Sequence, residues 1–241
     1  MAQQVPEFRF SEDALRVRQF VYEHWCTHGR GPNLRAVHEA TGLPRARLVD
    51  VYRELDLGLI VTLDHQTQNA ALLKCQPFSS YPSQVEVWLD GRFHCWAGCA
   101  MESVALSRMP PFAGRELRME SYCACCLGPV SVTTRDDQVL GARPDGVLIH
   151  VSTSPRDWNT TSIVCMCDSM NYVLDGEHAL AYERQISRRG VLFTLEQARR
   201  FVAGTGENRM WRYDWEPVVV RPERIIAGIK ALGVDVSNWG A

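Results

Sequence analysis

The sequence has no apolar run that approaches the roughly 18 residues needed for a membrane helix. Its start, MAQQVPEFRF, lacks the charged-then-apolar profile of a secretion signal. We therefore expect a cytoplasmic protein with no membrane partner. In that compartment an odd number of cysteines, nine, is not expected to form a disulfide framework. Reduced thiols would be available for soft metals, for catalysis or for packing.

Motifs of several common enzyme classes are also missing. There is no G-x-x-x-x-G-K-[ST] loop and no G-x-G-x-x-G after a strand, so the usual nucleotide-binding enzymes have no support. No G-x-S-x-G nucleophile elbow occurs either. The net charge of −2 gives no overall attraction to nucleic acid. What remains is an ordinary globular composition, 46% hydrophobic and 22% charged, over 241 residues.

Helical periodicity predicts three helices in the first 60 residues. The first begins at Ser11 and ends at Gly29, the second covers residues 34–40, and Gly42 makes the next turn. The third has one apolar face, formed by Leu48, Val51 and Leu55. Because an extended segment follows, we predict a winged-helix-like module over residues 1–60.

Winged-helix modules often bind DNA through basic residues on the third helix. Here Arg45, Arg47 and Arg53 lie on or near that helix, but acidic residues are interspersed with them. We therefore expect a packing module and no DNA partner, since a fold alone does not define a function.

After residue 60 the pattern changes to strands with intervening helices, which predicts an α+β fold. The Asp90-Gly91 pair is a hairpin turn signal. The segment SIVCMCDSMNYVL is interpreted as a strand, and Thr194 with Gln197 as the capping box of a helix that stops at Gly204. We expect a second domain, of mixed strands and helices, over residues 61–206. Residues 207–241 form an extension with three tryptophans and a helix over 222–232.

The stretch GCAMES places Cys99 three residues before Glu102. Positions i and i+3 share one face of a helix, so the thiol and the carboxylate can meet there. The carboxylate can take the thiol proton and later return it to a leaving group. Cys165 and Cys167 would point to the same side of the predicted strand, and either could complete a two-sulfur clamp for a soft ion.

Three segments in this order, CAMES, SYCACCLGPVSVTT and CDSMNYVLDGEHALAYE, resemble the organomercurial (alkylmercury) lyases. The resemblance covers roughly residues 11–204. Carried over position by position, it puts the two catalytic cysteines at Cys99 and Cys167 and the catalytic aspartate at Glu102. The structural cysteine of the family falls on Cys123.

In that family two thiolates hold the mercury of an R–Hg species, and the carboxylate delivers a proton to the carbon. The resemblance implies that Cys99 and Cys167 are mercury ligands and that Glu102 relays the proton. It also implies that no cofactor is required, with Hg(II) or another soft ion as product or ligand. The partners would be a small organometallic or electrophilic substrate and cellular thiols that accept the product, and a homodimer is left open.

Two departures from the family pattern leave alternatives open. Glu102 stands where the family has aspartate, and Asp168 follows Cys167, so Asp168 and Cys165 are further candidate ligands. The scaffold could cleave another carbon–heteroatom bond with Cys99 and Glu102, or serve as a soft-metal sensor or carrier that binds DNA. A structural zinc site built from the CACC segment at 123–126 with Cys95 or Cys165 is a lesser alternative.

The spacing of Cys99 and Glu102 alone is also compatible with a buried thiol beside an unrelated carboxylate. The downstream landmarks of the family favour a functional site over that interpretation.

Overall fold

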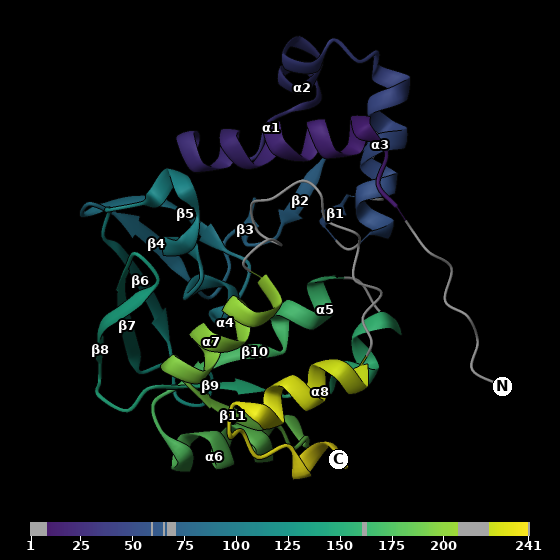
Figure 1. Cartoon of the computed structure of the whole chain (residues 1–241). Coiled ribbons are helices and arrows are strands. Elements are labelled where there is room, and N and C mark those ends of the chain that lie inside the picture. Colours follow the sequence, from purple (N-terminus) through teal and green to yellow (C-terminus); the bar gives the residue numbers. More distant parts are fainter. Residues whose placement is uncertain are drawn as a thin grey trace, which may run out of the picture.

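The fold is described from a computed structural model. It describes residues 9–58, 60–64, 66, 71–160, 163–206 and 222–240, without the side chains of 159–160, 163–165 and 203–206. Three helices pack together at one end of the molecule (Figure 1): α1 (Glu12–His28), α2 (Leu34–Thr41) and α3 (Arg45–Leu57). Ser11 caps α1 by accepting a hydrogen bond from the Ala14 N–H, and Gly29 ends it with a φ of 67°.

The predicted start and end of α1 are therefore confirmed, and α2 runs one residue beyond its predicted end. Gly42 ends α2 with a φ of 70°, and the predicted apolar face of α3 is buried. The Trp25 ring of α1 stacks on Phe78, with centroids 5.5 Å apart, and so joins the helices to the sheet below them.

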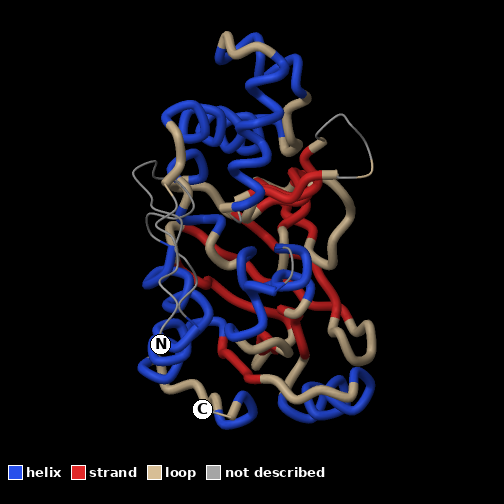
Figure 2. The backbone as a smooth tube through the Cα atoms, turned by 90° about the vertical axis from the view of Figure 1, so that its right-hand side faces the viewer, coloured by secondary structure: helices blue, strands red, loops and turns tan. Residues whose placement is uncertain are grey.

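A large antiparallel sheet occupies the middle of the molecule, as Figure 2 shows. Its strands lie in the order β1 (Val61–Leu63), β2 (Leu72–Cys75), β3 (Phe78–Ser79), β5 (Arg92–Ala97), β4 (Glu86–Leu89), β6 (Leu117–Tyr122), β7 (Pro129–Arg135) and β8 (Gln138–Arg143). Asp90 and Gly91 join β4 to β5 with positive φ angles of 49° and 80°, which a tight hairpin with right-handed twist requires. The predicted hairpin is confirmed.

A second, three-stranded sheet has the order β10 (Met170–Val173), β9 (Leu148–Val151) and β11 (Val191–Thr194). The helices α6 (Gly176–Ile186), α7 (Leu195–Gly206) and α8 (Pro222–Ala231) follow or flank it (Figure 1). The two sheets meet where β6 approaches β10, and the Ala124 N–H donates to the Tyr172 carbonyl at 2.9 Å. The architecture is a mixture of helix and sheet.

Residues 163–168 form a helix, α5 (Ile163–Asp168), so the prediction of one continuous strand is wrong there. A short apolar run does not distinguish a buried strand from a buried helix. Two side chains that follow the helix stabilise its C-terminus. The Ser169 hydroxyl donates a hydrogen bond to the Met166 carbonyl, and the Asn171 side-chain amide donates one to the Asp168 carbonyl. The strand β10 begins only at Met170.

Two other predicted boundaries differ. The helix that begins after Cys99 is only α4 (Ala100–Ser103), followed by the 3-10 turns η1 (Leu106–Arg108) and η2 (Pro110–Phe112), and α7 runs past Gly204 to Gly206. The capping box of α7 is confirmed, because Thr194 and Gln197 exchange hydrogen bonds of 2.9 and 3.1 Å.

The end of the chain packs onto the small sheet. α8 confirms the predicted helix there, and the Asn238 amide donates to the Gly190 carbonyl at 2.8 Å. Trp239 is buried, whereas Trp211 and Trp215 lie outside the described residues. Within the described part of the chain, every helix is too short or too polar to cross a bilayer.

Candidate active site

Cys99 lies at the junction between the large sheet and α4. It follows β5 and Gly98, and it is the N-cap of α4, with an extended backbone (φ −164°, ψ 175°). Its sulfur accepts a hydrogen bond from the Glu102 N–H at 3.4 Å. The thiol thus does what a serine or aspartate does at most helix N-termini. This local bond fixes the direction in which the sulfur points.

Glu102 folds back over the start of the same turn. The residue is 8% exposed, and its carboxylate lies against the Cα atom of Gly98. A Cβ atom at residue 98 would be 2.0 Å from Oε2 of Glu102, closer than any two such atoms can approach. A side chain at residue 98 would therefore displace the carboxylate from this position.

Cys167 comes from α5, far along the chain, and completes the group. Its Sγ lies 3.6 Å from Oε2 of Glu102, and the residue is 1% exposed. Sulfur and oxygen donor atoms of Cys99, Glu102 and Cys167 all lie within 4.8 Å of one another. Among the residues that the structure describes, this is the only such group of three potential ligands.

Burial dominates the electrostatics of Cys99. It raises the pKa of the thiol, because the thiolate is poorly solvated there, while the contact with Cys167 and the Glu102 N–H act in the opposite direction. The pKa of Cys167 is raised well above its ordinary value, first by the hydrogen bond to Cys99 and then by burial. Both sulfurs therefore hold their protons at neutral pH until an electrophile or soft ion displaces them.

Lys74, on β2, is a buried cation beside this group. Its ammonium donates to Oδ1 of Asp168 at 2.9 Å and to the Gly98 carbonyl at 3.4 Å. Burial disfavours its charge, but Cys167 and Asp168 outweigh burial and raise the lysine pKa. Lys74 was not among the site residues predicted from the sequence. The available signal was a lysine in the middle of the apolar run AALLKC, where a strand has little room for an unpaired charge.

The remaining predicted ligands lie differently. Asp168 pairs with Lys74, its side chain is 59% exposed, and it does not belong to the group of three. Cys165 is on α5, and its side chain lies outside the described residues. Since α5 is a helix, Cys165 and Cys167 do not share the strand face that was predicted for them.

The cysteine-rich turn between β6 and β7 does not assemble a zinc site in the described residues. Cys123 packs in a buried cluster with Val173 and Ala179, whereas Cys126 is exposed. Cys95 is buried in the main core. The buried position of Cys123 is compatible with the structural role that the family resemblance implies for it.

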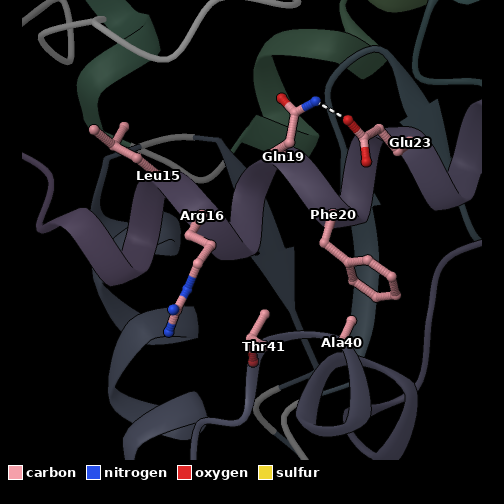
Figure 3. A pocket seen from close by; sticks show the side chains of 7 residues that line it. All are labelled: Leu15, Arg16, Gln19, Phe20, Glu23, Ala40 and Thr41. Carbon is pink, nitrogen blue, oxygen red and sulfur yellow. Dashed lines mark hydrogen bonds between the residues drawn. The ribbon is translucent and has the colours of Figure 1, made fainter.

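A hollow of about 460 Å³ opens on the surface between α1 and α2. Its lining residues are Leu15, Arg16, Gln19, Phe20, Glu23, Ala40 and Thr41 (Figure 3). None of them is a thiol. They belong to α1 and α2, whereas Cys99, Glu102 and Cys167 lie at α4 and α5. We therefore place the candidate active site at the buried group of Cys99, Glu102 and Cys167 and not at the hollow.

A mixed helix-and-sheet protein with a buried dithiol and carboxylate invites comparison with enzymes that handle soft metals. The family model described as MerB, alkylmercury lyase, matches residues 78–205, more than half of the chain. The protein belongs to the alkylmercury lyase family, and the resemblance predicted from its motifs is confirmed.

Among solved structures, the chain is similar to the mercury-bound form of MerB2, with a TM-score of 0.66 and 20% sequence identity. The match covers 82% of this chain and 91% of that one, and it shows a shared fold. No curated protein matches. The family match includes Cys99, Glu102 and Cys167 but begins four residues after Lys74.

Proposed function

We propose that this enzyme cleaves the carbon–mercury bond of organomercurials by protonolysis. Cys99 and Cys167 are the proposed mercury ligands, and Glu102 is the proposed proton relay. One observation carries the proposal: two thiols and one carboxylate converge within 4.8 Å in a site that excludes most water. Thiolates bind soft ions much more strongly than hard oxygen ligands do, so this donor set suits mercury.

The proposed reaction begins when one thiol displaces the ligand X from R–Hg–X, forming a sulfur–mercury bond and releasing HX. The second thiol then binds mercury, and its proton passes to Glu102. The 3.6 Å separation between the Cys167 sulfur and Oε2 of Glu102 suits this transfer. The acid finally gives the proton to carbon as the carbon–mercury bond breaks.

The overall change is R–Hg–X plus two thiols giving R–H, HX and a mercury dithiolate. No electron is gained or lost, so the proposal needs no redox cofactor. Cellular thiols are the proposed acceptors that remove Hg(II) from the two cysteines by ligand exchange. The buried thiols of the site are free in the structure, as a reducing cytoplasm would keep them.

The test is incubation of the reduced protein with phenylmercury or methylmercury, followed by measurement of benzene or methane. We expect Cys99→Ser and Cys167→Ser to abolish turnover, since either change leaves a single thiolate. Cys126→Ser is the matched control, because that cysteine is exposed and outside the group. Full hydrocarbon release by either site variant would reject the assignment.

We further propose that residues 1–60 are a winged-helix-like module, 61–206 the catalytic domain and 207–241 a C-terminal extension. Two arginines of α3 have local partners: Arg47 pairs with Asp13 at 2.8 Å, and Arg53 with Asp50 at 3.5 Å. Partly neutralised arginines support a packing role more than DNA binding. A DNA-binding assay with the full chain, expected to show no specific complex, checks this.

A further inference from the structure

Lys74 contacts the chain beside each of the two site thiols. Its Nζ lies 2.9 Å from the carboxylate of Asp168, the residue after Cys167, and 3.4 Å from the carbonyl of Gly98, the residue before Cys99. The lysine itself comes from β2, a third segment, and is 1% exposed. One ammonium therefore joins two segments that are distant in sequence but adjacent at the site.

Burying an ammonium destabilises the folded state, because the charged group loses its hydration. An apolar side chain would pack between the sheets at lower cost. The chain contains only two lysines but 24 arginines, so lysine at this position is not a matter of general usage. A compact ammonium has three donors that can reach several acceptors at once, which a planar guanidinium does less easily in a narrow space.

We propose that Lys74 is a positioning residue that sets the separation of the Cys99 and Cys167 sulfurs by holding Gly98 and Asp168 on one ammonium. The proposal rests on the proposed function only in taking these cysteines as the pair that binds the substrate atom. Without the ammonium, the residue before Cys99 and the residue after Cys167 lose their shared partner, and the weak Cys167–Glu102 contact of 3.6 Å is left to join α5 to α4. The two sulfurs then no longer share a fixed spacing.

Phenylarsine oxide measures this spacing directly. It reacts with two thiols to form two arsenic–sulfur bonds, the arsenic–oxygen bond breaks, and water leaves without any redox change. Tight binding requires both sulfurs at once, whereas iodoacetamide alkylates one thiol at a time. Cys125→Ser and Cys126→Ser together provide the background, because neighbouring cysteines outside the buried site would also capture the arsenical.

In this background we expect one arsenical per protein, lost on Cys167→Ser. Lys74→Met keeps the length of the side chain but removes its charge, and we expect about tenfold weaker arsenical binding. The rate of single alkylation at Cys99 should fall much less than the arsenical affinity, because the Lys74 charge is the smallest of the influences that lower the pKa of that thiol. Lys230→Met makes the same chemical change at an exposed lysine of α8 and should have no effect. Lys74→Arg, which keeps a cation, should recover part of the affinity.

If the arsenical affinity of folded Lys74→Met falls by less than about threefold, the proposal is overturned. If that variant does not fold, Asp168→Asn decides by the same threshold. The Asp168 side chain is more than half exposed, so the substitution should not unfold the protein, and it removes the ion pair with Lys74. A loss of both arsenical binding and single alkylation in Lys74→Met would also reject positioning, since it indicates general damage to the site.

The arsenical assay does not involve a carbon–mercury bond, so it separates this proposal from the proposed function. If organomercurials are not cleaved but arsenical binding depends on Lys74, positioning stands and the lyase proposal fails. If cleavage proceeds normally in Lys74→Met, positioning fails and the lyase proposal stands.

Discussion

At the scale of single residues, Glu102 shows how a longer side chain occupies a position where an aspartate is expected. The extra methylene is accommodated because the carboxylate folds back against Gly98 and still reaches the Cys167 sulfur. The thiol that caps α4 and the glycine before it are therefore parts of one local arrangement. Gly98 and Cys99 are the first two residues of the stretch GCAMES.

Gly98→Ala tests this arrangement. The added methyl group would overlap Oε2 of Glu102, so the carboxylate must move by about an ångström, and a shift of that size can cost about a hundredfold in rate. We expect a large loss in kcat with little change in mercurial binding, because neither sulfur is displaced. Gly228→Ala is the control, since nothing lies within 4 Å of a Cβ atom there. Unchanged kcat in Gly98→Ala would contradict the role of the glycine.

Glu102→Gln separates metal capture from proton delivery. The amide has nearly the same shape but cannot supply an acidic proton, so the variant should bind one mercurial and release no hydrocarbon. Mass spectrometry of the complex and gas chromatography of the headspace measure the two steps. Glu102→Asp should retain slow turnover, as the shorter acid withdraws from the Cys167 sulfur. Hydrocarbon release by the glutamine variant at the normal rate would exclude Glu102 as the donor.

The proximity of Cys99 and Glu102 could be predicted from the sequence because an i, i+3 spacing is a local property. The contacts of Lys74 could not be predicted, because they depend on β2 lying beside two segments that are distant in sequence. Cys167 was preferred to Cys165 by counting along the family pattern, whereas the strand periodicity proposed for both was wrong. Contacts between segments that are far apart in sequence leave little trace in either segment alone.

At the scale of elements, α7 illustrates a prediction that succeeds because its cause is local. The capping box is encoded by Thr194 and Gln197, and both reciprocal hydrogen bonds form. By contrast, the end of the short helix α5 is held by Asn171, which donates to the Asp168 carbonyl. The Asn171 side-chain amide also donates to the Tyr182 hydroxyl, and its side-chain oxygen accepts from the Gln84 amide. Those partners come from other elements, so residues 163–168 alone could not predict the helix.

Thr194→Ala should lower the free energy of unfolding by about 1 kcal/mol, the usual contribution of such a cap. Because α7 packs against α4, the site should also become less rigid, and kcat should fall modestly. Thr194→Ser retains the hydroxyl and should behave as the unchanged protein. Urea unfolding of the three proteins measures the difference, and equal midpoints for the alanine and serine variants would contradict the expectation.

At the scale of the whole molecule, buried thiols make the free energy of unfolding decrease at alkaline pH. Burial raises the pKa of both Cys26 and Cys75 to about 12. In the unfolded chain the same thiols ionise near pH 8.5, so above that pH the unfolded state has lost protons that the folded state still holds. The free energy of unfolding is therefore fully retained below about pH 8.5 and declines as the pH rises toward 12.

Each such thiol contributes about 1.4 kcal/mol per pH unit to this decline. Cys26→Ala removes one of them, so the slope of unfolding free energy against pH between 9 and 11 should become shallower by about that amount. Cys126→Ala, at an exposed position, should leave the slope unchanged. Denaturant titrations at several pH values test this, and parallel slopes for the original chain and Cys26→Ala would refute it.

Each thiol of the pair is attached to a different sheet. Cys99 follows β5 of the large sheet, and Cys167 precedes β10 of the small one. If the pair binds an ion as proposed, a substitution where β6 meets β10 changes the space between the sulfurs without touching the ion. The size of ion that the proposed site accepts would then depend partly on residues far from the ligands.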